Sequence, residues 1–239
     1  MSSARRVSVQ TDGMGAPRAD GCRSFAPGRA LVTAERILRV QGYTPGRRIP
    51  PALQNAAEST AEILARIAAP QARYRHLATR ALDEDGTLHL ADDIRFQCEA
   101  FNAYLGDCRE VVLFVLTLGP GIDLIERNLI GSGNLMEAVL LESAAWMAIE
   151  HATKKLARHI AAEMASEGLS PTRRMAPGYE FRVGGRKLSW PLEQHGQFFA
   201  AFGPGPLPVE LLESCAMTPK MSRSGLWGFR PRPERTLNE

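Results

Sequence analysis

The feature that most constrains the fold is an uninterrupted apolar run over residues 111–118, which Gly119-Pro120-Gly121 ends. Its side chains are mostly β-branched or large and apolar, and they do not alternate with polar ones. A run of this kind is typical of a strand that is buried on both faces. We therefore expect residues 111–118 to lie at the centre of a sheet.

The second constraint is a long helix that the apolar pattern predicts from about residue 135 to residue 167, with Gly168 after it. Apolar side chains recur in this stretch at a spacing close to 3.5 residues. A helix of this length would form the spine of the fold, ending at a glycine as helices commonly do. The expected stripe consists of Leu135, Val139, Trp146, Ile149, Leu156, Ile160 and Met164.

The remaining segments are shorter. Amphipathic spacing predicts helices over residues 31–40, 51–68 and 122–129, the second with proline in its first turn and another proline after its end. Residues 73–95 have a turn-and-strand pattern of the hairpin kind. Residues 172–229 are rich in Gly, Pro, Ser and aromatics and predict loops with short strands, where function is often found.

Composition and length favour one domain. The chain of 239 residues is 44% hydrophobic and 23% charged, as in ordinary globular proteins. We expect this domain over residues 31–230, between a disordered tail at residues 1–30 and a C-terminal tail at residues 231–239. The first segment is rich in small polar, Gly, Pro and Arg residues, which bury too little surface to fold. A transit peptide is the alternative interpretation of it.

Charge and cysteine content bear on partners and compartment. Five arginines against two aspartates in residues 1–30 account for the whole formal excess of +3, so the rest of the chain is neutral. We therefore expect no nucleic acid and no membrane as partners. The four cysteines have no CxxC spacing and no apolar leader precedes them, which favours reduced thiols and a cytoplasmic location.

Two segments in the last third carry a family resemblance. Residues 174–179 fit the pattern Arg-x-x-x-Gly-Tyr, and residues 213–225 fit Glu-Ser-x-Ala-Met-x-Pro followed by Ser-x-Ser-Gly. With the Trp-Pro-Leu-Glu-Gln segment at residues 190–194 between them, they resemble the S-adenosylmethionine-binding activation domain of cobalamin-dependent methionine synthase in a free-standing form. The resemblance extends over about residues 32–229.

The resemblance implies an α+β fold in which helices, one of them long, flank a curved and mainly antiparallel sheet. A shallow groove in that family holds S-adenosylmethionine, the expected cofactor. Carried over by position, its contacts are the loop residues Arg174, Ala176, Gly178 and Tyr179, together with Glu150 on the long helix and Trp227 near the end. Trp227 stands where the large enzymes of the family have tyrosine.

These residue types suit the chemistry of that ligand. A guanidinium can clamp its α-carboxylate, a carboxylate can attract its ammonium group, and an aromatic ring can face its sulfonium or adenine. Each residue also has a structural interpretation: Arg174 as a solvated charge, Glu150 as an ion pair with Lys154, and Gly178 as part of a simple turn. His151, His159 and His195 have no spacing that predicts a zinc site.

The resemblance implies an accessory role in a cobalamin-dependent methyltransferase, with no catalytic residue in this chain. S-adenosylmethionine would donate its methyl group to cobalamin on a corrinoid-binding protein or methionine synthase core, after reduction by a flavodoxin-like donor. We find no Asp-x-His-x-x-Gly corrinoid motif and no paired-cysteine zinc site in the sequence, so cobalamin is expected only through the partner. Whether methionine synthesis or demethylation is served stays open.

Two alternatives remain. The chain is a non-catalytic sensor of S-adenosylmethionine or a scaffold for corrinoid-protein assembly, or it is a relative that has lost the ligand. The second alternative would be favoured if residues 180–187, a basic and Gly-rich insertion after the Gly-Tyr pair, filled the groove.

Overall fold

A computed structural model of the chain describes residues 21–44 and 46–232. Within them, seven strands form one sheet in the order β4-β3-β2-β5-β11-β6, with β1 paired to β2, and every pairing is antiparallel. The strands are β1 (Arg23–Phe25), β2 (Gln71–Leu82), β3 (Thr87–Leu90), β4 (Arg95–Gln97), β5 (Glu110–Thr117), β6 (Leu169–Pro171) and β11 (Ser222–Pro231). The run at 111–118 thus forms the strand between β2 and β11, which confirms its predicted central place.

Helices cover both faces of this sheet. They are α1 (Ala34–Val40), α2 (Pro51–Ile67), α3 (Phe101–Leu105), α4 (Gly121–Gly131), α5 (Leu135–Ala165) and α6 (His195–Ala200), with 3-10 turns η1 (Ala91–Asp93) and η2 (Leu192–Gln194). Two small hairpins, β7 (Glu180–Val183) with β8 (Arg186–Ser189) and β9 (Glu210–Leu211) with β10 (Met217–Thr218), complete the described chain. The predicted α+β class and long helix are confirmed.

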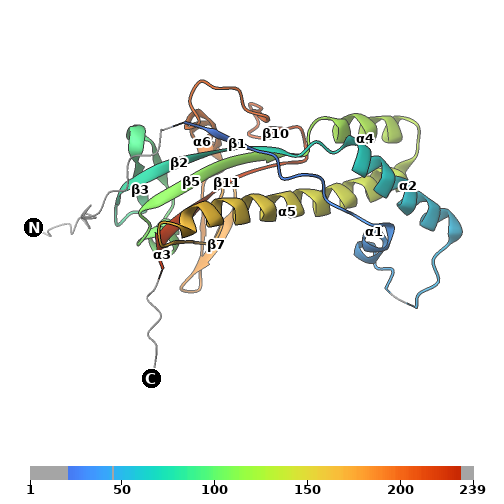
Figure 1. The fold of residues 1–239 in the computed structure, drawn as a ribbon, viewed down its shortest axis with the longest axis horizontal. Coiled ribbons are helices and arrows are strands. Elements are labelled where there is room, and N and C mark those ends of the chain that lie inside the picture. Colours follow the sequence, from blue (N-terminus) through green and yellow to red (C-terminus); the bar gives the residue numbers. More distant parts are fainter. Residues whose placement is uncertain (1–20, 45, 233–239) are drawn as a thin grey trace, which may run out of the picture.

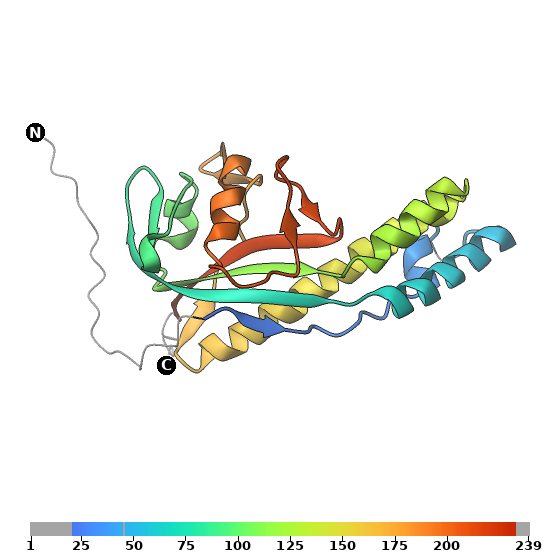
Figure 2. The same cartoon turned by 90° about the horizontal axis from the view of Figure 1, so that it is seen from above.

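The layers are visible in the two views of the ribbon. Figure 2 shows α5 along one face of the sheet, with α3, α6 and the β9–β10 hairpin on the other face. In Figure 1, α1, α2 and α4 gather around the N-terminal half of α5, beyond the end of the strands. The molecule is therefore elongated, and α5 connects the sheet with this group of helices.

Strand alternation explains why the centre is apolar throughout. On β5, Val112, Phe114 and Leu116 belong to the core beneath α5, whereas Val111, Leu113 and Val115 belong to the core on the opposite face. Because neighbouring side chains on a strand point to opposite faces, a strand with a core on each side is apolar on both faces, as residues 111–116 are.

The predicted stripe of α5 is wrong at its first three positions, whereas Ile149, Leu156, Ile160 and Met164 are buried as expected. Leu135, Val139 and Trp146 are exposed, and Trp146 keeps 54% of its surface in contact with solvent. The buried positions there are chiefly alanines, such as Ala144 and Ala148, which let α5 pack closely against its neighbours. Because protein interiors are close-packed, a buried helix face can consist largely of alanine, and a pattern of large apolar residues then does not identify it.

The predicted boundary of the N-terminal tail is also corrected within the described residues. Residues 23–25, expected in the disordered tail, form β1, which pairs with β2 over Arg23↔Tyr74 to Phe25↔Ala72. Phe25 stacks on His159 of α5 with 4.2 Å between ring centroids. The order comes from long-range pairing, which local composition does not reveal. The rest of the tail prediction, residues 1–20 and 233–239, lies outside the described residues.

The last strand is longer than the short strands expected in residues 172–229. β11 spans ten residues and contains Gly225 and Gly228. A Cβ atom at Gly225 would lie 2.6 Å from the Met175 carbonyl oxygen, and one at Gly228 would lie 2.5 Å from Cys108 Sγ. These glycines therefore permit close packing on both sides of a continuous strand and do not interrupt it.

A search of the described helices finds none that is both long enough and apolar enough to cross a membrane.

Candidate functional site

The segment that contains the Arg-x-x-x-Gly-Tyr pattern lies along the outer edge of β11. Met175 and Leu226 exchange backbone hydrogen bonds of 2.9 and 2.7 Å, and the Thr172 amide donates to the Gly228 carbonyl at 2.8 Å. Residues 174–179, which we call the edge loop, follow shortly after the end of β6 at Pro171 and are held to the sheet by main-chain bonds. Main-chain anchoring gives the loop a fixed position beside the strand.

Ala176 lies where the edge loop and β11 approach most closely. Its side chain is buried, and its Cβ lies 3.4 Å from the position that a Cβ would take at Gly225. A larger side chain at either position would separate the loop from the strand. The two small residues thus share one packing role, which the motif pattern alone did not reveal.

Arg174 and Tyr179 come together at the surface of this loop. The Arg174 Cζ atom lies 5.2 Å from the centroid of the Tyr179 ring, within cation–π range. Tyr179 is 49% exposed, and Arg174 Nη1 is buried without a hydrogen-bond partner in the part of the chain that the structure describes. A buried N–H group that makes no hydrogen bond is costly, so this nitrogen is suited to an anionic ligand.

Gly178 makes the turn that brings Tyr179 back over Arg174. Its φ of +82° lies in the left-handed region that favours glycine, and its amide donates to the Trp190 carbonyl at 2.7 Å. The Trp190 amide in turn donates to the Tyr179 carbonyl at 3.1 Å, and Trp190 itself is fully buried. Two backbone hydrogen bonds to the buried Trp190 therefore hold this turn in place.

Glu150 lies on α5 and is already paired with protein cations. Arg223, on the face of β11 that meets α5, donates to its Oε2 atom, and Lys154 Nζ lies 3.3 Å from its Oε1 atom. The Arg223 Cζ atom also lies 5.6 Å from the Trp146 ring centroid. The hydrogen bond from Arg223 lowers the pKa of Glu150 below its ordinary value, outweighing the opposite effect of burial.

Trp227 is placed in the core beneath α5. Its exposure is 6%, and its ring stacks on Phe114 with 4.2 Å between centroids and 16° between planes. One face of the indole is therefore already covered by protein. The expectation that this ring faces a ligand stays a prediction, and its packing role is the one that the geometry supports directly.

The structure thus divides the six expected ligand residues into groups. Arg174, Ala176, Gly178 and Tyr179 share the edge loop, Glu150 belongs to the ion-paired group on α5, and Trp227 is in the core. Among the described residues, no hydrogen bond, ion pair or ring contact joins Arg174 or Tyr179 to Glu150.

Comparison with known proteins addresses the fold. No protein-family model matches the sequence, and no curated protein matches it. Among solved structures, the MetH reactivation domain bound to AdoHcy is similar, with a TM-score of 0.55 and 12% sequence identity. The match covers 88% of this chain and 79% of that one. This chain has the methionine synthase reactivation-domain fold. That confirms the fold expected from the two motifs.

Within the reactivation-domain fold, the insertion at residues 180–187 forms the β7–β8 hairpin. It packs away from Arg174: Phe181 is buried in the core on the face opposite α5, and the Tyr104 hydroxyl donates to the Arg182 carbonyl at 3.0 Å. Arg186 Nη2 lies 3.1 Å from a Glu99 oxygen. These contacts direct the hairpin toward α3, which counts against the idea that it fills the ligand site.

The sequence interpretation missed Arg223 and Trp146 as members of the site region. Arg223 occupies the variable position of the Ser-x-Ser-Gly pattern, where no residue type is expected. Its partner Glu150 lies 73 residues earlier in the chain. The available signal was the spacing of Arg223 from Trp227 and Phe229. Even numbers of residues separate the three, so in a continuous strand their side chains point to the same face.

His195 of this reactivation-domain fold has protein partners on both ring nitrogens. His195 is buried, its Nδ1 donates to the Cys215 carbonyl at 3.1 Å, and its Nε2 accepts from the Ser224 hydroxyl at 2.8 Å. Burial lowers the pKa of His195, which favours the neutral ring. No group of three His, Cys, Asp or Glu residues within 21–44 and 46–232 has the arrangement of a metal site.

Proposed function

We propose that this chain binds S-adenosylmethionine at the edge loop and presents its methyl group to cobalamin on a separate corrinoid-binding protein or methionine synthase core. The observation that carries the proposal is the buried Arg174 Nη1, which has no described partner and lies beside the exposed Tyr179 ring. The solved domain of the same fold is bound to AdoHcy, the demethylated form of this ligand, and supports the proposal.

Each part of the ligand has a counterpart in the chain. The Arg174 guanidinium binds the α-carboxylate, and the Tyr179 ring packs against the cationic sulfonium or the adenine. The main chain of Ala176 and Gly178 offers groups for the rest of the ligand. Glu150 attracts the ammonium group, because a carboxylate paired with Arg223 and Lys154 still has free lone pairs.

The chain contributes binding and orientation to the reaction. Holding the methyl group in line with its acceptor, away from water, is the step that these residues can supply. Cobalamin, carried by the partner and reduced by a flavodoxin-like protein, would supply the nucleophile. The exposed apolar residues Val139 and Trp146, on the same helix as Glu150, offer this partner a contact surface.

The first test is calorimetric titration of the full chain with S-adenosylmethionine. We expect saturable binding by the wild type and its loss, by about tenfold or more, in Arg174→Ala, because a charge-assisted bidentate contact is removed. Arg173→Ala is the matched control. Arg173 has the same charge one position earlier, but it lies over Tyr104 and Phe181 on the other side of the loop.

Equal binding by the two variants would place the ligand elsewhere. No binding by folded wild-type protein would favour a relative that has lost the ligand.

A second test separates methyl transfer from a sensor or scaffold role. The wild-type chain would be mixed with reduced corrinoid protein and methyl-labelled S-adenosylmethionine, with Arg174→Ala as the control. Transfer of the label to cobalamin with the wild type, but not with Arg174→Ala, would support the activation role. Tight ligand binding without any transfer would leave the sensor or scaffold as the function.

A further inference from the structure

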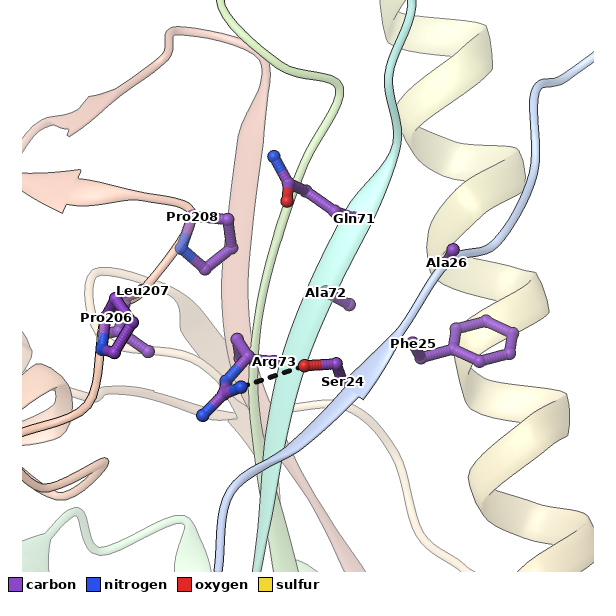
Figure 3. Close-up of a pocket in the computed structure, with 9 residues that line it drawn as sticks. All are labelled: Ser24, Phe25, Ala26, Gln71, Ala72, Arg73, Pro206, Leu207 and Pro208. Atoms are coloured by element: carbon purple, nitrogen blue, oxygen red, sulfur yellow. Dashed lines mark hydrogen bonds between the residues drawn. The ribbon is translucent and has the colours of Figure 1, made fainter.

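A hollow lies beside β2, away from the edge loop. It has a volume of about 570 Å³ and is bounded by β1, the first residues of β2 and the loop at 206–208 (Figure 3). Because the sheet order is β2-β5-β11, two strand spacings separate β2 from β11, the strand along which the edge loop lies. We call this hollow the β2 pocket.

Arg73 is the one charged residue among those that line the β2 pocket. Figure 3 shows its side chain directed from β2 toward Pro206 and Leu207. Arg73 Nη1 donates to the Ser24 hydroxyl at 2.9 Å, and Arg73 Nε is buried with no hydrogen-bond partner in the described part of the chain. No carboxylate of the described residues forms an ion pair with Arg73, so the pocket keeps a net positive charge.

Arg75 lies on the same face of β2, and both of its terminal guanidinium nitrogens have protein partners. Its Nη1 donates to the Ala201 carbonyl at 2.5 Å, and its Nη2 is paired with Asp92. Arg73, two residues earlier, has only a neutral hydroxyl. Leaving a partly buried guanidinium nitrogen without a partner is costly, and the chain avoids that cost for Arg75 but not for Arg73.

The walls of the β2 pocket favour an anion attached to an apolar body. Leu207, Pro206 and Pro208 form one wall, and the pocket contains no acidic residue that would repel an anion. A Cβ at Gly205 would lie 3.6 Å from Arg73 Nη2, so the loop passes directly beside the guanidinium. A ligand that enters here meets a fork of N–H donors beside prolines, which have little freedom to lose on binding.

The space continues beyond the β2 pocket. An adjoining hollow of about 380 Å³ shares Ala26 and Gln71 with it and is lined by Arg29, whose Nε donates to the Ala68 carbonyl at 2.8 Å. A ligand longer than the β2 pocket can therefore extend along residues 26–29 without meeting an acidic lining residue.

The geometry points to a binding site for a small organic anion, a carboxylate or a phosphate ester, in the β2 pocket. Its anionic group binds Arg73 and the Ser24 hydroxyl, and its apolar body packs against Leu207 and Pro206. This site is independent of S-adenosylmethionine binding at the edge loop.

The test is an NMR titration of the full chain with two probes, phenyl phosphate and benzoate. We expect saturable shifts of the Ser24 and Gln71 amides with at least one probe. The tighter probe assigns the anion as a phosphate ester or a carboxylate. Arg73→Gln should weaken binding about tenfold or more, because charge-assisted bonds are lost. Arg66→Gln, which removes an exposed charge on α2, should bind like the wild type.

A second variant guards against a fold defect in Arg73→Gln. Pro206→Asp keeps Arg73 and its bond to Ser24 but adds a carboxylate that competes for the guanidinium, so it should also abolish probe binding. Arg174→Ala should leave probe binding unchanged, which separates this site from the edge loop. The proposal is overturned if the folded wild type gives no saturable shifts, or if Arg73→Gln and Pro206→Asp bind both probes as the wild type does.

Discussion

The edge loop and the strand beside it each carry an arginine and an aromatic residue, but their surroundings differ. On β11, Arg223 is paired with Glu150, and Trp227 is stacked on Phe114 in the core. In the edge loop, Arg174 keeps a buried nitrogen without a described partner, and half of the Tyr179 ring is exposed. Arg223 also has a buried Nε without a described hydrogen-bond partner, so the two arginines differ in whether a carboxylate of the described chain neutralises them. An arginine paired with a protein carboxylate contributes to the fold, whereas one without such a partner is available to an anionic ligand.

The two aromatic residues should therefore differ most in stability. We expect Trp227→Ala to lower the free energy of unfolding by about 3–5 kcal/mol, because it removes a large buried ring and leaves a cavity. Tyr179→Ala should change it by about 0.5 kcal/mol or less, since its half-exposed ring lies at the surface. Urea unfolding followed by circular dichroism measures both values. Similar losses of unfolding free energy in the two variants would contradict the view that Trp227 stabilises the fold and Tyr179 does not.

The ion pair between Glu150 and Arg223 should contribute less to the free energy of unfolding than the buried Trp227 ring. Glu150→Gln leaves Arg223 without its carboxylate, and because Glu150 is about half exposed we expect a loss of about 2 kcal/mol at neutral pH. Lys154→Gln, which removes the more exposed partner of the same carboxylate, should cost far less.

The same pair predicts a pH dependence. Arg223 lowers the pKa of Glu150 in the folded state, so its stabilising effect is fully present above the ordinary pKa of 4.5 and is lost as pH falls through the lowered value. Between pH 7 and pH 3, the free energy of unfolding should therefore fall more steeply for the wild type than for Glu150→Gln. Parallel curves would mean that Arg223 does not stabilise the ionised carboxylate.

A smaller loss than that of the ion pair is expected at the turn of the edge loop. Gly178→Ala places a Cβ on a residue at φ +82°, and we expect a loss of about 1 kcal/mol from backbone strain. The added Cβ would also lie 3.1 Å from Leu192 Cδ1, which can shift. Gly196→Ala is the control, since this helical glycine has open space around it and alanine there should be neutral or stabilising. A stable Gly178→Ala variant would show that the turn is not fixed by its backbone conformation.

Local patterns predicted the parts of the fold that depend on neighbouring residues. The apolar run at 111–118, the end of α5 near Gly168 and the start of α2 at Pro51 all follow from short-range signals. β1 and the full length of β11 did not, because their order comes from pairing with strands far away in the sequence.

The same division holds for the site. Arg174 and Tyr179 were found because their pattern lies within six residues, and the structure brings them together. The burial of Trp227 and the pairing of Arg223 with Glu150 depend on how α5 crosses the sheet. The pair of Glu150 with Lys154, four residues away on the same helix, was predicted and is confirmed. No local pattern contains the crossing of α5 over the sheet, so Arg223 as a partner of Glu150 and Phe114 as a partner of Trp227 were not predicted.

The most direct test of the central claim is an NMR titration of isotopically labelled chain with S-adenosylmethionine. If the edge loop holds the ligand, saturable shifts should concentrate at the amides of Ala176, Gly178 and Tyr179, with smaller changes near Glu150. Shifts that concentrate instead at Ser24 and Gln71 in the β2 pocket, or no shifts in the folded protein, would contradict the account.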